Sequence, residues 1–229
     1  RTEEPDYSTF SNNHHDWSDT VYGNPVEDKP EEPPEPLGKR VTIGSYFDAN
    51  LMHDILSGKA CTGIIHFLNK TPIDWYSKKQ ATSETATYSA EYCACRTCIE
   101  QIIDLRNTLR YLGVNLNDKT YVFGDNESMI NSSIIPHARL HKRHNILSYH
   151  YVRSMIASGF LNMQHLPSES NAADVCSKNW GYQSAWKQIL QPILNWAGDV
   201  GYLVEQDPLH VQVANIVTQL NDGEYCKFQ

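Results

Sequence analysis

Residues 88–109, YSAEYCACRTCIEQIIDLRNTL, have the spacing of one long amphipathic helix, which needs a large apolar surface to pack against. Positions stepped by three and four along it are apolar with one exception. They are Tyr88, Glu91, Cys95, Cys98, Ile102, Leu105 and Leu109. A carboxylate that faces a core costs several kcal/mol, roughly, unless a cation, a metal or good hydrogen bonds compensate it. Glu91 therefore lies either at the half-exposed rim of the helix or in a site.

Runs rich in β-branched and aromatic residues lie on both sides of this helix. Three precede it, at 39–50, 61–70 and 73–80, with a turn at 69–72. Two more follow, at 120–126 and 160–167, and a short helix from Glu127 and a second helix over 145–157 lie between them. The order predicts an antiparallel meander, then parallel strands reached through crossover helices. We expect an α/β domain with a mixed five-stranded sheet flanked by helices.

Glycines and polar residues mark the expected ends of the helices. Gly113 is expected to end the long helix, and Gly159 is expected to end the helix over 145–157. A further helix, the last one within the folded domain, is expected to begin in SNAADVCSK, with Ser170 or Asn171 as its N-cap.

The first 38 residues differ in composition from the rest of the chain. They contain ten acidic and two basic residues and end in EDKPEEPPEPLG, which predicts a disordered or extended connector. The other residues carry 17 acidic and 17 basic side chains, so the net charge of −8 reflects the connector alone. We expect the folded domain over 39–180, then a C-terminal helix and tail over 181–229.

Leader and cysteine patterns indicate the compartment. The chain begins with Arg1, has no signal-peptide pattern and has no apolar stretch of membrane-spanning length, so we expect an intracellular piece of a longer protein, neither secreted nor membrane-bound. Three of the six cysteines lie in CACRTC, but no fourth ligand follows at a zinc-site spacing. The cysteines are therefore interpreted as packing residues in a reducing compartment.

Three further acids lie at the ends of the expected elements. Asp48 closes the first strand, Asp125 closes the fourth, and Asp174 lies near the start of the last helix. Ligands gather outside the carboxyl ends of strands in open sheets, so Asp48 and Asp125 would face one site and Glu91 would point at it from the covering helix. A strand end, an Asp-Asn turn and a helix-dipole contact are the structural alternatives for the three aspartates.

Four converging carboxylates would repel one another unless cations lie between them. Two divalent ions roughly 3.5 to 4 Å apart would satisfy all four and would support phosphodiester hydrolysis. Hard oxygen ligands favour Mg²⁺, for which Mn²⁺ can substitute. We expect two such ions and no small-molecule cofactor.

A basic segment would complement a polyanionic substrate. Residues 128–168 contain no Asp or Glu, whereas HARLHKRHNILSYHYVR is rich in cations. A solvated helix face is the alternative, and no Cys or His pair matches His137, His141 and His144 as zinc ligands. The expected nucleic-acid-binding residues are Lys78, Lys79, Arg139, Lys142, Arg143, His144, His150 and Arg153.

Four stretches, in this order, resemble the ribonuclease H domain at the end of the Pol polyprotein of copia-type LTR retrotransposons. They are IDWYSKKQATSETATYSAEY, VFGDNESMI, KRHNILSYHYVR and NAADVCSK, and the likeness covers about 41–180. The resemblance implies a ribonuclease H-like fold. It also implies that the metal-binding and catalytic acids are Asp48, Glu91, Asp125 and Asp174.

The same resemblance implies a function and partners. The domain would cut the RNA strand of an RNA/DNA hybrid during reverse transcription, next to an upstream reverse transcriptase domain of the same polyprotein. His144 and His150 match recurrent histidines of the family, and His141, His144 and His150 are candidate proton shuttles.

Two other functions remain open from the sequence. One is a degenerate, non-catalytic nucleic-acid-binding or connection module, against which the presence of all four acids argues. The other is an integrase-like nuclease, which the spacing from Asp48 to Glu91 to Asp125 disfavours. The paired-aspartate motif of a reverse transcriptase and the zinc ligands of an integrase do not occur in this sequence, so neither activity is expected of this chain.

Overall fold

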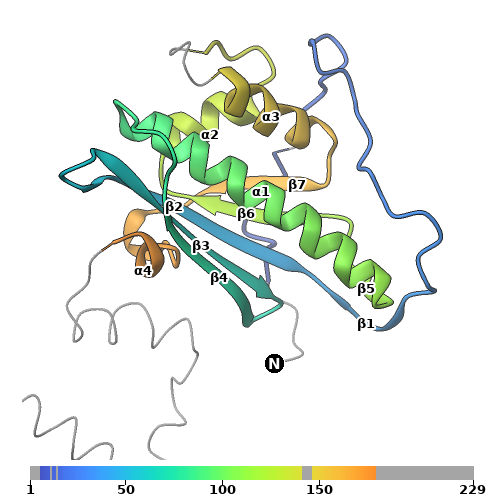
Figure 1. The fold of residues 1–229 in the computed structure, drawn as a ribbon. Coiled ribbons are helices and arrows are strands. Elements are labelled where there is room, and N and C mark those ends of the chain that lie inside the picture. The colour runs from blue at the N-terminus through green and yellow to red at the C-terminus, as the bar shows by residue number, and fades with distance from the viewer. Residues whose placement is uncertain (1–5, 11, 14, 141–145, 179–229) are drawn as a thin grey trace, which may run out of the picture. The chain divides into compact units, whose positions relative to one another are not determined.

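The computed structural model describes residues 6–10, 12–13, 15–140 and 146–178, all within one compact unit that spans Arg1–Tyr182. Along these residues, four strands precede the long helix α1, and two further strands, two helices, a strand and a short helix follow it (Figure 1). The elements are β1 (Leu37–Val41), β2 (Ile43–Asp54), β3 (Lys59–Leu68), β4 (Thr71–Lys79), α1 (Thr87–Tyr111), β5 (Val114–Leu116), β6 (Thr120–Gly124), α2 (Glu127–Ile134), α3 (Ile146–Ala157), β7 (Leu161–His165), a 3₁₀ turn (Ser168–Ser170) and α4 (Asp174–Ser177).

The larger sheet of the described residues has five strands in the order β4-β3-β2-β6-β7. Short hairpins make β2, β3 and β4 antiparallel, whereas β6 pairs with β2, and β7 with β6, in parallel. The parallel pairs follow from the crossovers through α1 and through α2 and α3, because a parallel neighbour needs a long connection. The predicted mixed five-stranded α/β sheet is confirmed.

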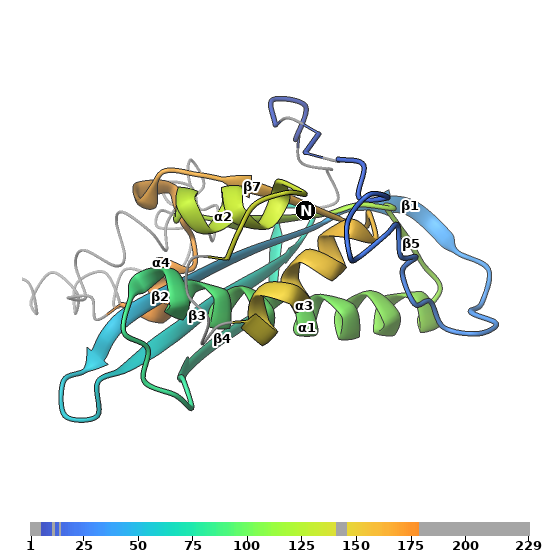
Figure 2. The same cartoon turned by 90° about the horizontal axis from the view of Figure 1, so that it is seen from above.

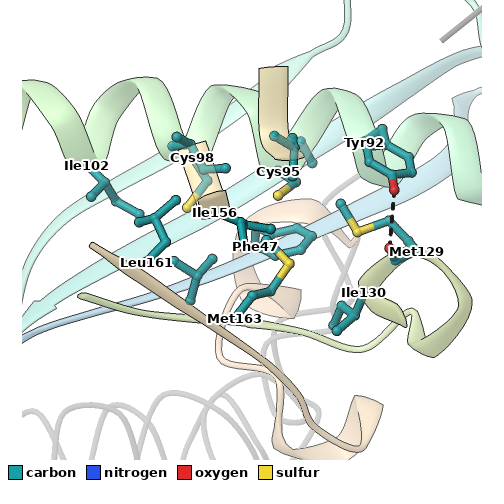
Figure 3. Close-up of a cluster of buried hydrophobic side chains, with 14 of the residues drawn as sticks. Phe47, Tyr92, Cys95, Cys98, Ile102, Met129, Ile130, Ile156, Leu161 and Met163 are labelled. Atoms are coloured by element: carbon teal, nitrogen blue, oxygen red, sulfur yellow. Dashed lines mark hydrogen bonds between the residues drawn. The ribbon is translucent and has the colours of Figure 1, made fainter. Parts of the chain in front are cut away.

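Helix α1 crosses one face of the sheet (Figures 1 and 2). Its apolar stripe is buried: Cys95, Cys98 and Ile102 are fully inaccessible and pack with Phe47 of β2 and Met163 of β7 (Figure 3). These two cysteines are free thiols that fill core space. The helix ends at Tyr111, and Gly113 follows with a φ of +70°, as predicted for a glycine that ends a helix.

Helix α4 packs over β3 and contacts β2 and β4 as well. It approaches β3 at Gly63, where a Cβ atom would lie 2.6 Å from the carbonyl oxygen of Ala173 and from the amide nitrogen of Ser177. The predicted N-cap was wrong, because α4 begins at Asp174 with Ala173 as its cap residue. Asn171 instead accepts from Ala173 N and donates to Phe47 O at 2.9 Å, which fixes the loop to β2.

The first strand was predicted as one run over 39–50, but the chain leaves the ladder at Thr42. The amide of Thr42 donates to Asn69 Oδ1 and its carbonyl accepts from Asn69 N, so this residue pairs with the β3–β4 turn. The residues before it form β1, which pairs in parallel with β5 in a separate two-stranded sheet. Beyond Asp48 the strand does not end as predicted, since β2 continues to Asp54.

No helix or strand precedes Leu37 among the described residues, yet this segment contacts the domain. The side chain of Trp17 is fully buried, and Glu27 forms ion pairs with Arg106 and Arg110. These contacts were not anticipated from the composition of residues 1–38. The predicted C-terminal helix and tail lie outside the described residues. Within the described part of the chain, no helix has the length and hydropathy of a membrane span.

Candidate metal centre and nucleic-acid interface

Three aspartates from separate elements meet at one end of the β2–β6 pair. The parallel register pairs Tyr46 of β2 with Phe123 of β6. Asp48 lies two residues after Tyr46 in β2, and Asp125 lies two residues after Phe123, just past the end of β6. Asp174, the first residue of α4, joins them from the helix that packs on β3. Carboxylate oxygens of the three aspartates all lie within 4.8 Å of one another, so the predicted convergence of these residues is present.

Glu91 lines the same pocket as Asp48 and Asp125. It lies in the second turn of α1 and is only 2% exposed, so the half-exposed rim position is excluded. Its Oε1 accepts a hydrogen bond from Ala49 N at 3.3 Å. Its Oε2 has no hydrogen-bond partner among the described residues. A buried carboxylate oxygen that lacks a donor is a costly feature, and it fits a ligand position.

Burial and mutual repulsion shift the titration of this group of acids. Burial raises the pKa of Asp48 to about 6, and the neighbouring charges of Asp174 and Asp125 add to the rise. Burial, together with Asp48 and Asp125, raises the pKa of Glu91 well above its usual value. The pKa of Asp174 is also raised, chiefly by burial. The apo site therefore disfavours the fully ionised state.

Ser177 in α4 and Lys178 just after it partly compensate the negative charge of the acids. The sequence analysis did not predict either residue as part of the site. The hydroxyl of Ser177 donates to Asp48 Oδ2. Lys178 Nζ forms an ion pair with Asp174 Oδ2 at 2.7 Å. The spacing of four residues between Asp174 and Lys178 was visible in the sequence as a helical ion-pair pattern.

The donor set fits a hard divalent cation. Asp48, Glu91, Asp125 and Asp174 present carboxylate oxygens from separate parts of the fold. Among the described residues, no sulfur or imidazole joins the cluster of three aspartates, and Glu91 Oε2 has no donor. Oxygen-only sites suit Mg²⁺ and Mn²⁺, and a cation would relieve the repulsion that raises these pKa values.

A second, larger pocket of about 680 Å³ lies between β4 and α1. Four basic side chains from three elements line it, together with the acidic side chains of Asp54 and Glu100: Lys59, Lys78, Lys79 and Arg96. Arg96 forms an ion pair with Glu100 at 2.9 Å. Lys78 and Lys79 are exposed as expected, although Lys79 also pairs with Asp54 at 2.9 Å. In the sheet, Lys78 of β4 lies opposite Thr62 of β3, and Thr62 lies opposite Ala49 of β2. The pocket is therefore two strands away from Ala49, the residue that follows Asp48.

The other predicted nucleic-acid contacts divide into four groups, of which Arg153 is the last. Arg139 is exposed. His150 is also exposed, but its Nδ1 lies 2.5 Å from the hydroxyl of Tyr22 in the N-terminal segment. Lys142, Arg143 and His144, as well as His141, lie outside the described residues.

The prediction for Arg153 was wrong. Its side chain is 2% exposed, and the guanidinium donates to the carbonyls of Ser132, Ile135 and Pro136. Because the buried residues Tyr149, Val152, Arg153 and Ile156 share one face of α3, the side chain points into the domain, where phosphates have no access.

The fold and the site together define a ribonuclease H-like α/β domain. Its features are a meander of three strands, a covering helix, two parallel strands and a group of acids beside β2 and β6. In sequence, the chain is similar to segments of retrovirus-related Pol polyproteins from plant transposons, so the predicted resemblance is confirmed. It is 31% identical over 144 residues to the polyprotein of transposon TNT 1-94 from Nicotiana tabacum, and 27% identical over 143 residues to that of RE2 from Arabidopsis thaliana. Each match covers 62% of this chain.

The matched segment is only 10% of the length of either polyprotein. Among solved structures, the chain is similar to LC11-RNase H1 in complex with RNA/DNA hybrid, at 19% identity and a TM-score of 0.47, over 59% of this chain and 94% of that one. No family model matches the chain.

Proposed function

We propose that this chain is the ribonuclease H of a retrotransposon polyprotein, which cuts the RNA strand of RNA/DNA hybrids by two-metal hydrolysis. The observation that carries the proposal is the meeting of three aspartates from β2, the β6 end and α4 beside the buried Glu91. Such an arrangement destabilises the metal-free domain, and a divalent-metal active site accounts for it.

The four acids have distinct positions from which to hold two ions. Asp48 belongs to the cluster with Asp125 and Asp174 and also lines the pocket of Glu91, so it would be the ligand shared by both ions. Glu91 and Asp125 would hold one ion, and Asp174 would hold the other, on the side of the attacking water. Divalent ions in such a site lower the pKa of a bound water and stabilise the leaving oxygen. The products expected are a 5′-phosphate and a 3′-hydroxyl.

The chain's own groups fix the acids in place. The amide of Ala49 holds Glu91 Oε1, the hydroxyl of Ser177 holds Asp48, and Asn171 attaches the loop before α4 to the carbonyl of Phe47. Each bond restricts the carboxylates to the pocket before a cation arrives. This preorganisation reduces the reorganisation needed in the reaction.

The basic pocket beside α1 supports a duplex substrate. Lys59, Lys78 and Arg96 would contact phosphates of the strand that is not cut, since this pocket is displaced from the acids by two strands of the sheet. Such contacts carry affinity without base readout, so recognition would depend on duplex shape and 2′-hydroxyls, and sequence preference would be weak. The upstream partner would be the reverse transcriptase of the same polyprotein.

Cleavage of a labelled RNA/DNA hybrid tests the proposal, with duplex DNA and single-stranded RNA as alternative substrates. The natural chain should cut only the RNA strand of the hybrid, and only with Mg²⁺ or Mn²⁺. Asp48→Asn should reduce the rate by at least ~100-fold, since it removes the shared ligand. Hybrid binding without cleavage by the natural chain would identify a degenerate, non-catalytic module instead.

A further inference from the structure

The acidic segment before β1 lies against the domain at both of its described ends. We call the described residues from Tyr7 to Glu27 the strap; it contains no helix or strand. Tyr7 packs on Tyr121 of β6 with ring centroids 4.2 Å apart, Asn13 donates to Met163 O of β7 at 2.9 Å, and Asn12 accepts from Lys119. The strap therefore contacts β6 and β7, the two strands at one edge of the larger sheet.

The first anchor of the strap is Trp17. Its side chain is fully buried, with the ring 4.8 Å from the Arg153 guanidinium carbon and 5.6 Å, edge to face, from the Tyr22 ring. The Nε of Arg153 donates to Tyr22 Oη at 3.2 Å. The same guanidinium donates to the carbonyls at the C-terminal end of α2. Arg153 thus joins the strap to the helix that follows Asp125.

The second anchor is Glu27. Both carboxylate oxygens accept from Arg106, at 2.6 and 3.1 Å, and both accept from Arg110, at 2.9 and 2.8 Å. Arg106 is 1% exposed, and its Nε donates to Glu27 Oε1. Loss of Glu27 would leave a buried guanidinium charge without its carboxylate, which is a strongly destabilising change.

We infer that the strap is an intramolecular partner that the domain requires, bound by Trp17 and Glu27. Its binding surface has a socket at one end, formed by Tyr149 and Arg153 of α3, and a pair of arginines on α1, Arg106 and Arg110, at the other. An acidic segment with one tryptophan complements both. The folded unit therefore includes the strap, and a chain cut at Lys39 lacks part of its core. This inference is independent of the proposed reaction.

The test uses the full chain with a site-specific protease sequence inserted after Glu31, in a fully exposed stretch. After cleavage, the N-terminal fragment should co-elute with the rest of the chain in gel filtration at physiological salt. With Trp17→Ala or Glu27→Ala in the same background, the fragment should separate. Separation of the fragment from the otherwise natural chain would overturn the inference.

Thermal unfolding of the uncut chain provides the second measurement. Trp17→Ala and Glu27→Ala should each lower Tm by roughly 5 to 15 °C. Val21→Ala and Val26→Ala are matched controls, because these strap residues are 88% and 85% exposed and should leave Tm within ~1 °C. Equal effects at the anchors and the controls would contradict the inference. Failure of only the anchor variants to fold would support it.

Discussion

The ammonium of Lys178 lies 2.7 Å from Oδ2 of Asp174, and it also lines the pocket that contains Asp48, Glu91 and Asp125. Burial alone lowers the pKa of Lys178, but the hydrogen bond to Asp174 and the charges of Asp48 and Asp125 raise it overall. A cation from the protein thus partly neutralises the acids before any metal binds. Lys178 and a metal ion then compete for the same carboxylate.

Replacing this lysine should strengthen metal binding. Lys178→Met removes the competing charge, so the Mg²⁺ or Mn²⁺ concentration that gives half of the maximal rise in Tm should fall by about fivefold, or ~1 kcal/mol after allowance for solvent screening. The apo protein should be less stable than the natural chain. Lys79→Met is the control, since Lys79 pairs with Asp54 on the surface and should leave metal affinity unchanged. Weaker metal binding by Lys178→Met would contradict the competition.

Neutralising Glu91 should separate stability from metal binding. Glu91→Gln removes a buried ionisable group whose Oε2 has no donor among the described residues, so the metal-free chain should gain up to ~1 kcal/mol. The rise in Tm on adding Mn²⁺ should disappear, because a ligand is lost. Glu100→Gln, in an exposed ion pair on the same helix, should keep that rise. A metal-dependent rise that survives Glu91→Gln would exclude Glu91 from the site.

The stability of the metal-free protein should fall as the pH rises through the folded-state pKa values of these acids. The folded-state pKa of Asp48, about 6, exceeds its unfolded value of 3.8, so the folded state keeps a proton that the unfolded state loses. This contribution to stability is complete below pH ~4 and is lost by pH ~7, a change of about 2 to 3 kcal/mol. Denaturant unfolding in a chelator at pH 4.5 and 7.5 measures it.

A substitution and a metal should each change that dependence of stability on pH. In Asp48→Asn the slope should be smaller, and the contributions of Glu91 and Asp174 should remain. Saturating Mg²⁺ should reverse the sign, because the ion binds only the deprotonated acids. An identical slope in the natural chain and in Asp48→Asn would refute the assignment of the titration to Asp48.

The close approach of α4 to β3 predicts a distant effect on the site. In Gly63→Ala the new methyl would collide with backbone atoms of Ala173 and Ser177, so α4 must shift and move Asp174 away from Asp48. We expect a loss of about 1 to 3 kcal/mol in stability and a larger relative loss of hybrid cleavage. Gly58→Ala, in a hairpin with open space around it, should cost stability through its φ of +67° yet keep the cleavage rate. Similar rates in both variants would argue against the contact.

The pocket between β4 and α1 predicts a specific salt dependence. Lys78→Met should weaken hybrid binding uniformly across sequences and reduce the slope of log affinity against log salt by about one. Arg153→Met should leave that slope unchanged, because the guanidinium is buried against carbonyls. Binding titrations at several salt concentrations, with the catalytically inactive Asp48→Asn background, distinguish the two residues.

Periodicity predicted the main elements and the unusual position of Glu91. The same rule, applied to the helix over 145–157, would have found Arg153, because it lies on a stripe with Tyr149, Val152 and Ile156. The cationic composition of that stretch drew attention to phosphate binding instead. A buried arginine and a buried glutamate leave the same signal, a charge on an apolar stripe, and only their partners distinguish packing from chemistry.

Long-range partners explain what the sequence could not predict. Trp17 is a single tryptophan in an acidic segment that has no hydrophobic periodicity. Its burial depends on Arg153, which is 136 positions away in the sequence. The end of β1 depends on a side-chain bond from Asn69, and the start of α4 depends on a bond between Asn171 and Phe47. None of these pairs has a local pattern, so composition and spacing do not predict them.

The parallel pairing of β2 with β6 has a consequence for how such chains diverge. The separation of Asp48 and Asp125 is set by main-chain hydrogen bonds, which every residue except proline can make. Substitutions of the surrounding side chains leave that separation intact, provided that the sheet still forms. Over the 144 residues in which this chain is 31% identical to a tobacco transposon polyprotein, such a main-chain register can persist while side chains around it change.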